Sequence, residues 1–328
     1  MQAEGCVFVV VPFEEKRPDE ALHFQIKFTN LLCPDAVAVL DISRSKLLPA
    51  GWFTLAAHSD VPPLVDYLYT LHLHGNDKHD HLYIRTAGLR CLGLRELEIL
   101  DATKENYPRY ADLMCFTAEK LLLRGELENA MTPFTTVRRA NGSPVQLVWK
   151  SVADAEADYK GAKDSGWIVR NEFYGEDIAE AADNAVLFLY DGENPDGSVR
   201  SKHLGTLTNA DFEQFRYGQY IVTGRKTAAL AKENWPLFCS LRDKLPDNAY
   251  VLVKYEPEDE DADEDEIWVQ VTETDKTGFR GLLTDDCDAG KAGEPFSGKT
   301  DDLLDFSVRV NENIVVHPNT AYIALDIE

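Results

Sequence analysis

The chain has 328 residues, of which 44% are hydrophobic and 27% are charged, and its formal net charge at pH 7 is −24. A chain of this length can bury a sizeable core and is long enough for two or three domains. Its acidity disfavours binding to nucleic acid or to an anionic membrane surface, because both carry negative charge.

The cysteines and the first apolar segment indicate the compartment. Six cysteines are scattered along the chain without a C-x-x-C pair, which is typical of reduced thiols in a cytoplasmic protein. The apolar segment CVFVVVPF is too short to cross a bilayer, and Glu4 precedes it where a signal peptide would carry basic residues. We therefore expect a cytoplasmic protein that does not bind membranes, and we interpret residues 7–11 as a buried first strand.

The first 128 residues predict an α+β domain. Alternation, helical periodicity and turn residues predict strands at 7–11, 36–42 and 96–100, helices at 19–32, 49–58 and 107–124, and a hairpin at 67–86. Gly125 supplies a stop signal for the last helix. This domain is expected to end near residue 128.

Residues 129–246 predict a second α+β domain, which follows a turn-rich stretch with the sequence NGSP. The patterns predict strands at 145–149, 185–190 and 220–222, a helix at 153–162 and a long helix at 223–244 with Thr223 as its N-cap. Pro236 lies inside that long helix and should kink or divide it.

Residues 247–328 predict a small β module. Short alternating runs such as VLVKY, IWVQVTET and LLDFSVRV are separated by turn residues and leave no room for a long helix. We therefore expect a small antiparallel sheet or barrel. The predicted fold class for the whole chain is α+β, with several domains and mixed sheets with helices.

The segment GEPFSGKT at 293–300 matches the spacing of a phosphate-binding P-loop. A working P-loop needs a buried strand before it and a helix after it, since the helix N-terminus and backbone N–H groups hold the phosphates. Here a polar loop precedes the motif, while Asp301, Asp302 and an alternating strand follow it. The context predicts a Gly-rich loop of a β module and not a nucleotide site.

Four histidines in the predicted hairpin are candidate metal ligands: His72, His74, His79 and His81. A symmetric four-residue turn would place His74 opposite His79 and His72 opposite His81, with all four rings on one face. Imidazole nitrogens suit zinc, nickel or copper. The alternative interpretation is four solvated histidines at an exposed hairpin tip.

An acidic run, EPEDEDADEDE at 256–266, invites a calcium ion but fails the EF-hand spacing, because Glu264 stands where the loop requires glycine. We interpret the run as a solvated loop between two strands. Such acidity could attract a basic protein partner.

Several stretches resemble a bacterial family of unknown function, catalogued as domain of unknown function four-zero-two-six. The resemblance rests on AVLDIS at 38–43, VPPLVDYLYTLH at 61–72 and GLRCLGLRELEILDATKENY at 88–107. The C-terminal IWVQVTETDKTGFRGLLTDD is similar to a second module, domain of unknown function two-three-one-four. Related small modules occur near bacterial toxin and immunity genes, which implies an interaction role. The family supplies no catalytic residue.

These patterns favour a non-catalytic cytoplasmic binding or regulatory protein, of an immunity type, with a basic protein as its partner. A contiguous acidic or apolar patch without a deep polar pocket would support this hypothesis. The alternative is a metal-dependent hydrolase that uses the histidine hairpin with zinc or nickel. The sequence contains no recognisable nucleophile motif, and it leaves the oligomeric state open.

Overall fold

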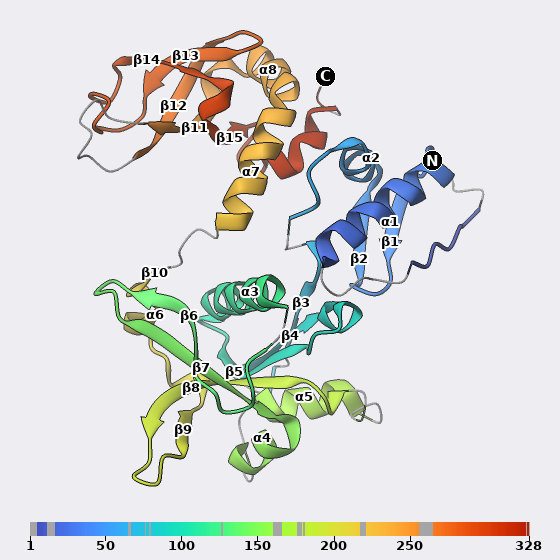
Figure 1. Ribbon diagram of the computed structural model, residues 1–328, viewed down its shortest axis with the longest axis vertical. Coiled ribbons are helices and arrows are strands. Elements are labelled where there is room, and N and C mark those ends of the chain that lie inside the picture. Colours follow the sequence, from blue (N-terminus) through green and yellow to red (C-terminus); the bar gives the residue numbers. More distant parts are fainter. Residues whose placement is uncertain are drawn as a thin grey trace.

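The computed structural model describes residues 5–11, 17–64, 67–75, 77–78, 80–125, 127–159, 166–175, 179, 181–216, 221–255, 265–325 and 327. Within these ranges the chain forms three sheets with helices packed around them (Figure 1). The predicted α+β, multidomain fold class is confirmed.

The N-terminal unit is built from two helices and a hairpin. Its elements are α1 (Pro18–Leu32), β1 (Ala38–Asp41), β2 (Lys46–Pro49) and α2 (Ala50–His58), which confirms both predicted helices. The predicted strand at 36–42 corresponds to β1, which pairs with β2 alone instead of entering a central sheet. The buried strand predicted at 7–11 is wrong: the segment has no regular structure and pairs with no described strand, and Val7 and Val10 are exposed.

The middle of the chain forms an eight-stranded sheet within the described residues, in the order β10-β6-β7-β8-β5-β4-β3, with β9 paired to β8. The expected division at residue 128 runs through this sheet, since β5 pairs in parallel with β8. The remaining neighbours are antiparallel. The strands are β3 (Thr70–His74), β4 (His81–Ala87), β5 (Leu97–Thr103), β6 (Phe134–Arg139), β7 (Pro144–Ser151), β8 (Ala185–Glu193), β9 (Val199–Lys202) and β10 (Phe215–Arg216).

Helices cover both faces of this sheet (Figure 1). On one face lies α3 (Tyr107–Arg124), whose predicted bounds are confirmed, and on the other lie α4 (Val152–Tyr159) and α5 (Gly166–Tyr174). Strand alternation in β5 explains the two cores: Leu97 and Ile99 belong to the cluster that includes α3, whereas Leu100 packs with α4 and α5. A short helix, α6 (Asn209–Glu213), and the 3₁₀ turns η2 (Leu89–Leu92) and η4 (Leu204–Thr206) complete this part.

The C-terminal unit packs two helices on an open antiparallel sheet. Pro236 divides the predicted long helix, as expected, into α7 (Ile221–Glu233) and α8 (Trp235–Lys244). The predicted strand at 220–222 and the Thr223 N-cap are wrong, because Ile221 is already helical; Tyr220 lies outside the described residues. The strand order is β14-β13-β12-β11-β15-β16.

These strands are β11 (Ala249–Tyr255), β12 (Asp265–Thr274), β13 (Gly278–Leu283), β14 (Pro295–Lys299), β15 (Leu303–Arg309) and β16 (Val315–Val316), with 3₁₀ turns η5 (Pro246–Asn248), η6 (Thr300–Asp302) and η7 (Pro318–Leu325). The P-loop-like segment is strand β14, in which Gly298 lies opposite Phe279 of β13. It therefore lacks the strand–loop–helix geometry that phosphate binding requires. No helix in the described ranges is long and apolar enough to cross a membrane.

Candidate functional site

The histidine hairpin is present, but its register differs from the prediction. His72 lies opposite Arg85 and His74 lies opposite Tyr83. The predicted pairing of His72 with His81 is therefore wrong by four residues on β4, because the stretch between the last paired residues, His74 and Tyr83, runs from residue 75 to residue 82 and is four residues longer than the predicted turn.

This register separates the candidate ligands. The rings of His72 and His74 lie side by side on β3, with centroids 5.9 Å apart. His81 begins β4 and pairs with Thr103 of β5, while His79 lies outside the described residues. Within the described ranges, no three His, Cys, Asp or Glu side chains are grouped so that they could hold a metal ion.

The two adjacent histidines pack against a cation and an aromatic ring. Arg85 places its Nη2 atom 3.4 Å from Nδ1 of His72, and Phe173 of α5 lies with its ring centroid 3.8 Å from that of His74. Burial, and then the charge of Arg85, lower the pKa of His72 and lower the pKa of His74 to about 4. Because the guanidinium also repels a metal cation, these contacts favour a packing role for both rings.

A buried ion pair lies on the same side of the sheet. Glu98 Oε2 accepts a hydrogen bond from Arg170 Nε at 2.6 Å, and both side chains are fully buried. The other carboxylate oxygen accepts hydrogen bonds from Tyr83 Oη at 2.8 Å and Asn184 Nδ2 at 2.7 Å. Burial raises the pKa of Tyr83 far above its ordinary value. The network ties α5 to the sheet in a closed environment, as a structural ion pair does.

A second polar cluster joins α4 to β5. Tyr159 Oη donates to Asp101 Oδ2 at 2.6 Å, and His203 Nδ1 lies 3.4 Å from the same oxygen. The ring of His203 stacks on Tyr159 with centroids 4.3 Å apart. Burial raises the pKa of Asp101 and of Tyr159. The contacts therefore hold three separate segments together at the end of β5.

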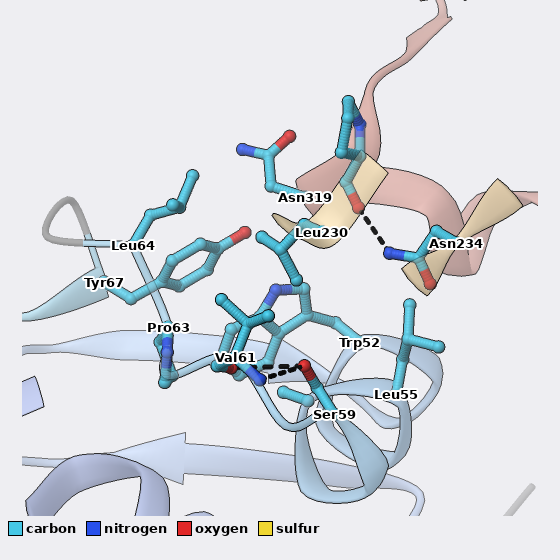
Figure 2. Close-up of a pocket in the computed structure, with 12 residues that line it drawn as sticks. Trp52, Leu55, Ser59, Val61, Pro63, Leu64, Tyr67, Leu230, Asn234 and Asn319 are labelled. Carbon is cyan, nitrogen blue, oxygen red and sulfur yellow. Dashed lines mark hydrogen bonds between the residues drawn. The ribbon is translucent and has the colours of Figure 1, made fainter. Parts of the chain in front are cut away.

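A small cleft of about 30 Å³ that opens to solvent lies where the N-terminal unit meets the C-terminal unit. Figure 2 shows Trp52, Tyr67 and Leu230 facing the same space, with the side-chain amide of Asn319 at its edge. The rings of Trp52 and Tyr67 stack with centroids 4.3 Å apart. The walls are Trp52, Leu55, Ala56, Ser59, Val61, Pro63, Leu64, Tyr67, Leu230, Asn234, Pro318 and Asn319.

Polar contacts hold the two units together beside this cleft. Lys226 of α7 forms an ion pair with Asp19 of α1 at 2.6 Å and also donates to the carbonyl of Pro63 at 3.2 Å. Ser59 Oγ donates to Glu233 Oε2 at 3.0 Å. The cleft is therefore built by two units that are far apart in the sequence, an arrangement common among ligand sites.

Two sequence profiles of one family match the chain. The profile described as "Protein of unknown function (DUF4026) N-terminal" matches residues 1–63, and the corresponding C-terminal profile matches residues 71–183. Together they cover more than half of the chain. The chain belongs to the DUF4026 family. No curated protein and no solved structure matches it significantly.

The DUF4026 matches end at residue 183, before the C-terminal unit. The likeness of that unit to domain of unknown function two-three-one-four consequently stays a prediction. The N-terminal profile contains the whole N-terminal unit, including its most unusual surface.

This surface was not singled out from the sequence. More than half of the large apolar side chains that are exposed in the described residues of this DUF4026 protein lie between positions 7 and 47. We use the name N-terminal apolar surface for the exposed apolar side chains of two elements of this unit, Phe24, Phe28 and Leu31 on α1 and Leu40 and Leu47 on the β1–β2 hairpin. The sequence does contain a pattern that could have predicted this surface. Phe24, Phe28 and Leu31 have the spacing of one apolar stripe of a helix, and Leu22 and Ile26 form a second stripe on its other side.

Proposed function

We propose that this DUF4026 protein is a non-catalytic cytoplasmic binding protein, and that the N-terminal apolar surface docks a partner protein. The observation that carries this proposal is that α1 is apolar on two opposite sides. Leu22 and Ile26 are buried in the core, whereas Leu31 on the outer side is 78% exposed and Phe24 and Phe28 stack on each other in solvent. An apolar stripe of a helix normally packs against another element, and α1 has a second such stripe that no described element covers.

The adjacent hairpin repeats this pattern in a β element. Val39 and Leu48 form a cross-strand pair that packs against the core, while Leu40 and Leu47 form the next pair and are 63% and 70% exposed. Strands that are apolar on both faces usually lie between two layers of structure. Exposed apolar patches of this kind mark interaction sites in soluble proteins.

Charge indicates the chemistry of the partner. Residues 17–58 contain four acidic and four basic side chains, so this unit is neutral, whereas the whole chain carries −24. The contact itself would then be apolar, and the acidic remainder would attract a partner with basic charge around its apolar face. A second copy of this chain is a poorer fit because two acidic bodies repel. The immunity-type role inferred from the C-terminal resemblance would make that partner a basic toxin-like protein.

The proposal is tested by affinity purification from the cells that produce the protein, followed by a binding titration with the recovered partner. The Leu40→Thr/Leu47→Thr variant keeps strand-compatible residues but makes the outer face polar. Loss of the partner in this variant, with retention in Leu282→Thr on the exposed side of β13, is the expected result. Equal binding by both variants would contradict the proposal.

The charge argument has its own test. Raising the salt concentration should slow association of the purified pair, because screening removes the long-range attraction. An association rate that does not change with salt would exclude a basic partner. A concentration-dependent dimer of the protein alone, lost in Leu40→Thr/Leu47→Thr, would instead identify a second copy as the occupant.

A further inference from the structure

The segment at 5–11, with the sequence GCVFVVV, has the composition of a strand. Its last five residues are all β-branched or aromatic, which favours strand structure. The segment contains no helix, turn or bend, so its backbone is extended. It pairs with no strand in the described ranges, and the side chains of Val7, Phe8 and Val10 are 61%, 77% and 91% exposed. A strand-like segment is therefore present without a neighbouring strand.

One side of this segment faces α1. The side-chain amide of Gln25 donates to the carbonyl of Val9 at 3.4 Å. In an extended backbone the N–H and C=O groups of one residue point to the same side, and those of the next residue point to the opposite side. The groups of Val9 therefore face α1, whereas those of Phe8 and Val10 face away from it. Within the described ranges, no residue forms a hydrogen bond with the backbone of Phe8 or Val10.

The open side of the segment is suited to a second strand. A row of unpaired N–H and C=O groups on an extended, apolar segment is a template for pairing with another chain. A strand of another protein would satisfy these groups with main-chain hydrogen bonds and would also cover apolar side chains. Phe8 and Val10 lie on one face of the segment, because alternate residues share a face. A matching strand therefore carries β-branched or aromatic residues at alternate positions.

We propose that residues 5–11 bind the partner protein by strand pairing, in which an open edge strand of the partner hydrogen-bonds to the backbone of Phe8 and Val10. This inference rests on the proposed docking function and names the kind of structure that the partner must offer. Gln25, which holds the segment, is next to Phe24 of the N-terminal apolar surface. Strand pairing and apolar docking then use neighbouring parts of one unit. A second copy of the chain is a poorer occupant, since each copy carries −24.

Proline substitutions at two neighbouring positions test the pairing, because proline removes one backbone N–H and keeps an apolar side chain. Val10→Pro removes an N–H from the open side. Val9→Pro, the same change one residue earlier, removes an N–H from the side that faces α1. The probe is the partner that the wild-type chain recovers from its own cells, identified by mass spectrometry and then purified. Val10→Pro should weaken binding of this protein at least about tenfold, and Val9→Pro should leave it nearly unchanged.

Hydrogen–deuterium exchange supplies a second measurement. The amides of Phe8 and Val10 should exchange rapidly in the free chain and slowly in the complex. Urea unfolding of the two proline variants should match the wild type, because the segment makes few contacts. Equal binding by Val9→Pro and Val10→Pro would overturn the inference. Slow exchange of the Phe8 and Val10 amides in the free chain would also overturn it, since a strand of the same chain would then cover them.

The outcomes separate this inference from the proposed function. A partner that is lost in Leu40→Thr/Leu47→Thr but binds Val10→Pro as tightly as the wild type overturns strand pairing and leaves the proposed docking surface standing. A partner that is lost in Val10→Pro but kept in Leu40→Thr/Leu47→Thr supports strand pairing and contradicts that surface. Recovery of no partner by the wild type overturns both. A dimer of the chain alone that is lost in Val10→Pro and kept in Val9→Pro makes a second copy the occupant and overturns the choice of partner.

Discussion

The N-terminal unit and the C-terminal unit differ in how much of the apolar surface of their helices they bury. In the C-terminal unit, α8 turns Trp235, Phe238 and Leu241 into the core and leaves polar residues such as Asp243 in solvent. In the N-terminal unit, α1 buries one apolar face and exposes a second. The difference supports the proposal that another protein covers the second apolar face of the N-terminal unit.

The largest expected effect compares the same substitution in the two units. Phe238 is fully buried against Phe306, with ring centroids 5.2 Å apart, so Phe238→Ala should lower the free energy of unfolding by about 3–5 kcal/mol. Phe28→Ala on the outer face of α1 should change it by less than about 0.5 kcal/mol. Urea unfolding of both variants checks the difference. A large loss in Phe28→Ala would show that the outer face already has a partner within the chain.

A buried polar contact in the central sheet should give the next largest effect. Glu98→Gln leaves the fully buried guanidinium of Arg170 without its charged partner, so we expect a loss of about 3 kcal/mol in the free energy of unfolding. The double variant Glu98→Gln/Arg170→Met should recover part of this loss, because the unpaired charge is also removed. If Glu98→Gln and Glu98→Gln/Arg170→Met unfold at the same urea concentration, Glu98 and Arg170 do not act as a buried charge pair.

Sequence patterns predicted local structure well where one signal dominated. The bounds of α3 followed from helical periodicity and Gly125, and the division between α7 and α8 followed from Pro236. The strand predicted at 7–11 was wrong. An apolar, β-branched run is typical of a strand, but a strand also needs a partner strand, and composition does not show whether one is present. The predicted register of the β3–β4 hairpin was wrong because the length of the loop, and not only its turn residues, fixes which residues pair.

Contacts between distant segments could not be predicted. The parallel pairing of β5 with β8, the pair Glu98–Arg170 and the cleft that joins Trp52 to Leu230 each bring together residues far apart along the chain. Periodicity describes one element at a time and gives no information on such neighbours. The second apolar stripe of α1 was visible in the sequence, but its exposure depends on what the rest of the chain covers.

A smaller effect should be seen in the binding of an environment-sensitive apolar dye. The exposed pairs of the N-terminal apolar surface should bind the dye in the native state, and Leu40→Thr/Leu47→Thr should reduce the signal. Leu282→Thr, which removes an exposed leucine from the C-terminal unit, should have little effect. An equal reduction of the dye signal in the two variants would show that the N-terminal unit exposes no more apolar surface to the dye than the C-terminal unit does.

The smallest effect concerns pH. Burial and Arg85 lower the pKa of His74 to about 4 from its ordinary value of 6.5, so between these values the unfolded chain binds a proton that the folded chain does not. Stability should therefore fall as the pH decreases from about 6.5 to 4. His74→Phe, which keeps a ring against Phe173, should lose less stability between pH 7 and pH 5 in urea unfolding. If the wild type and His74→Phe lose the same stability between pH 7 and pH 5, the pKa of His74 is not lowered in the folded protein.

The most direct test of the central claim is hydrogen–deuterium exchange of the protein with and without its purified partner. Docking on the N-terminal apolar surface should slow exchange in α1 and in the β1–β2 hairpin and leave β13 and β14 unchanged. Slowed exchange confined to the C-terminal unit, with α1 and the hairpin unaffected, would contradict the account and move the docking site to the other end of the chain.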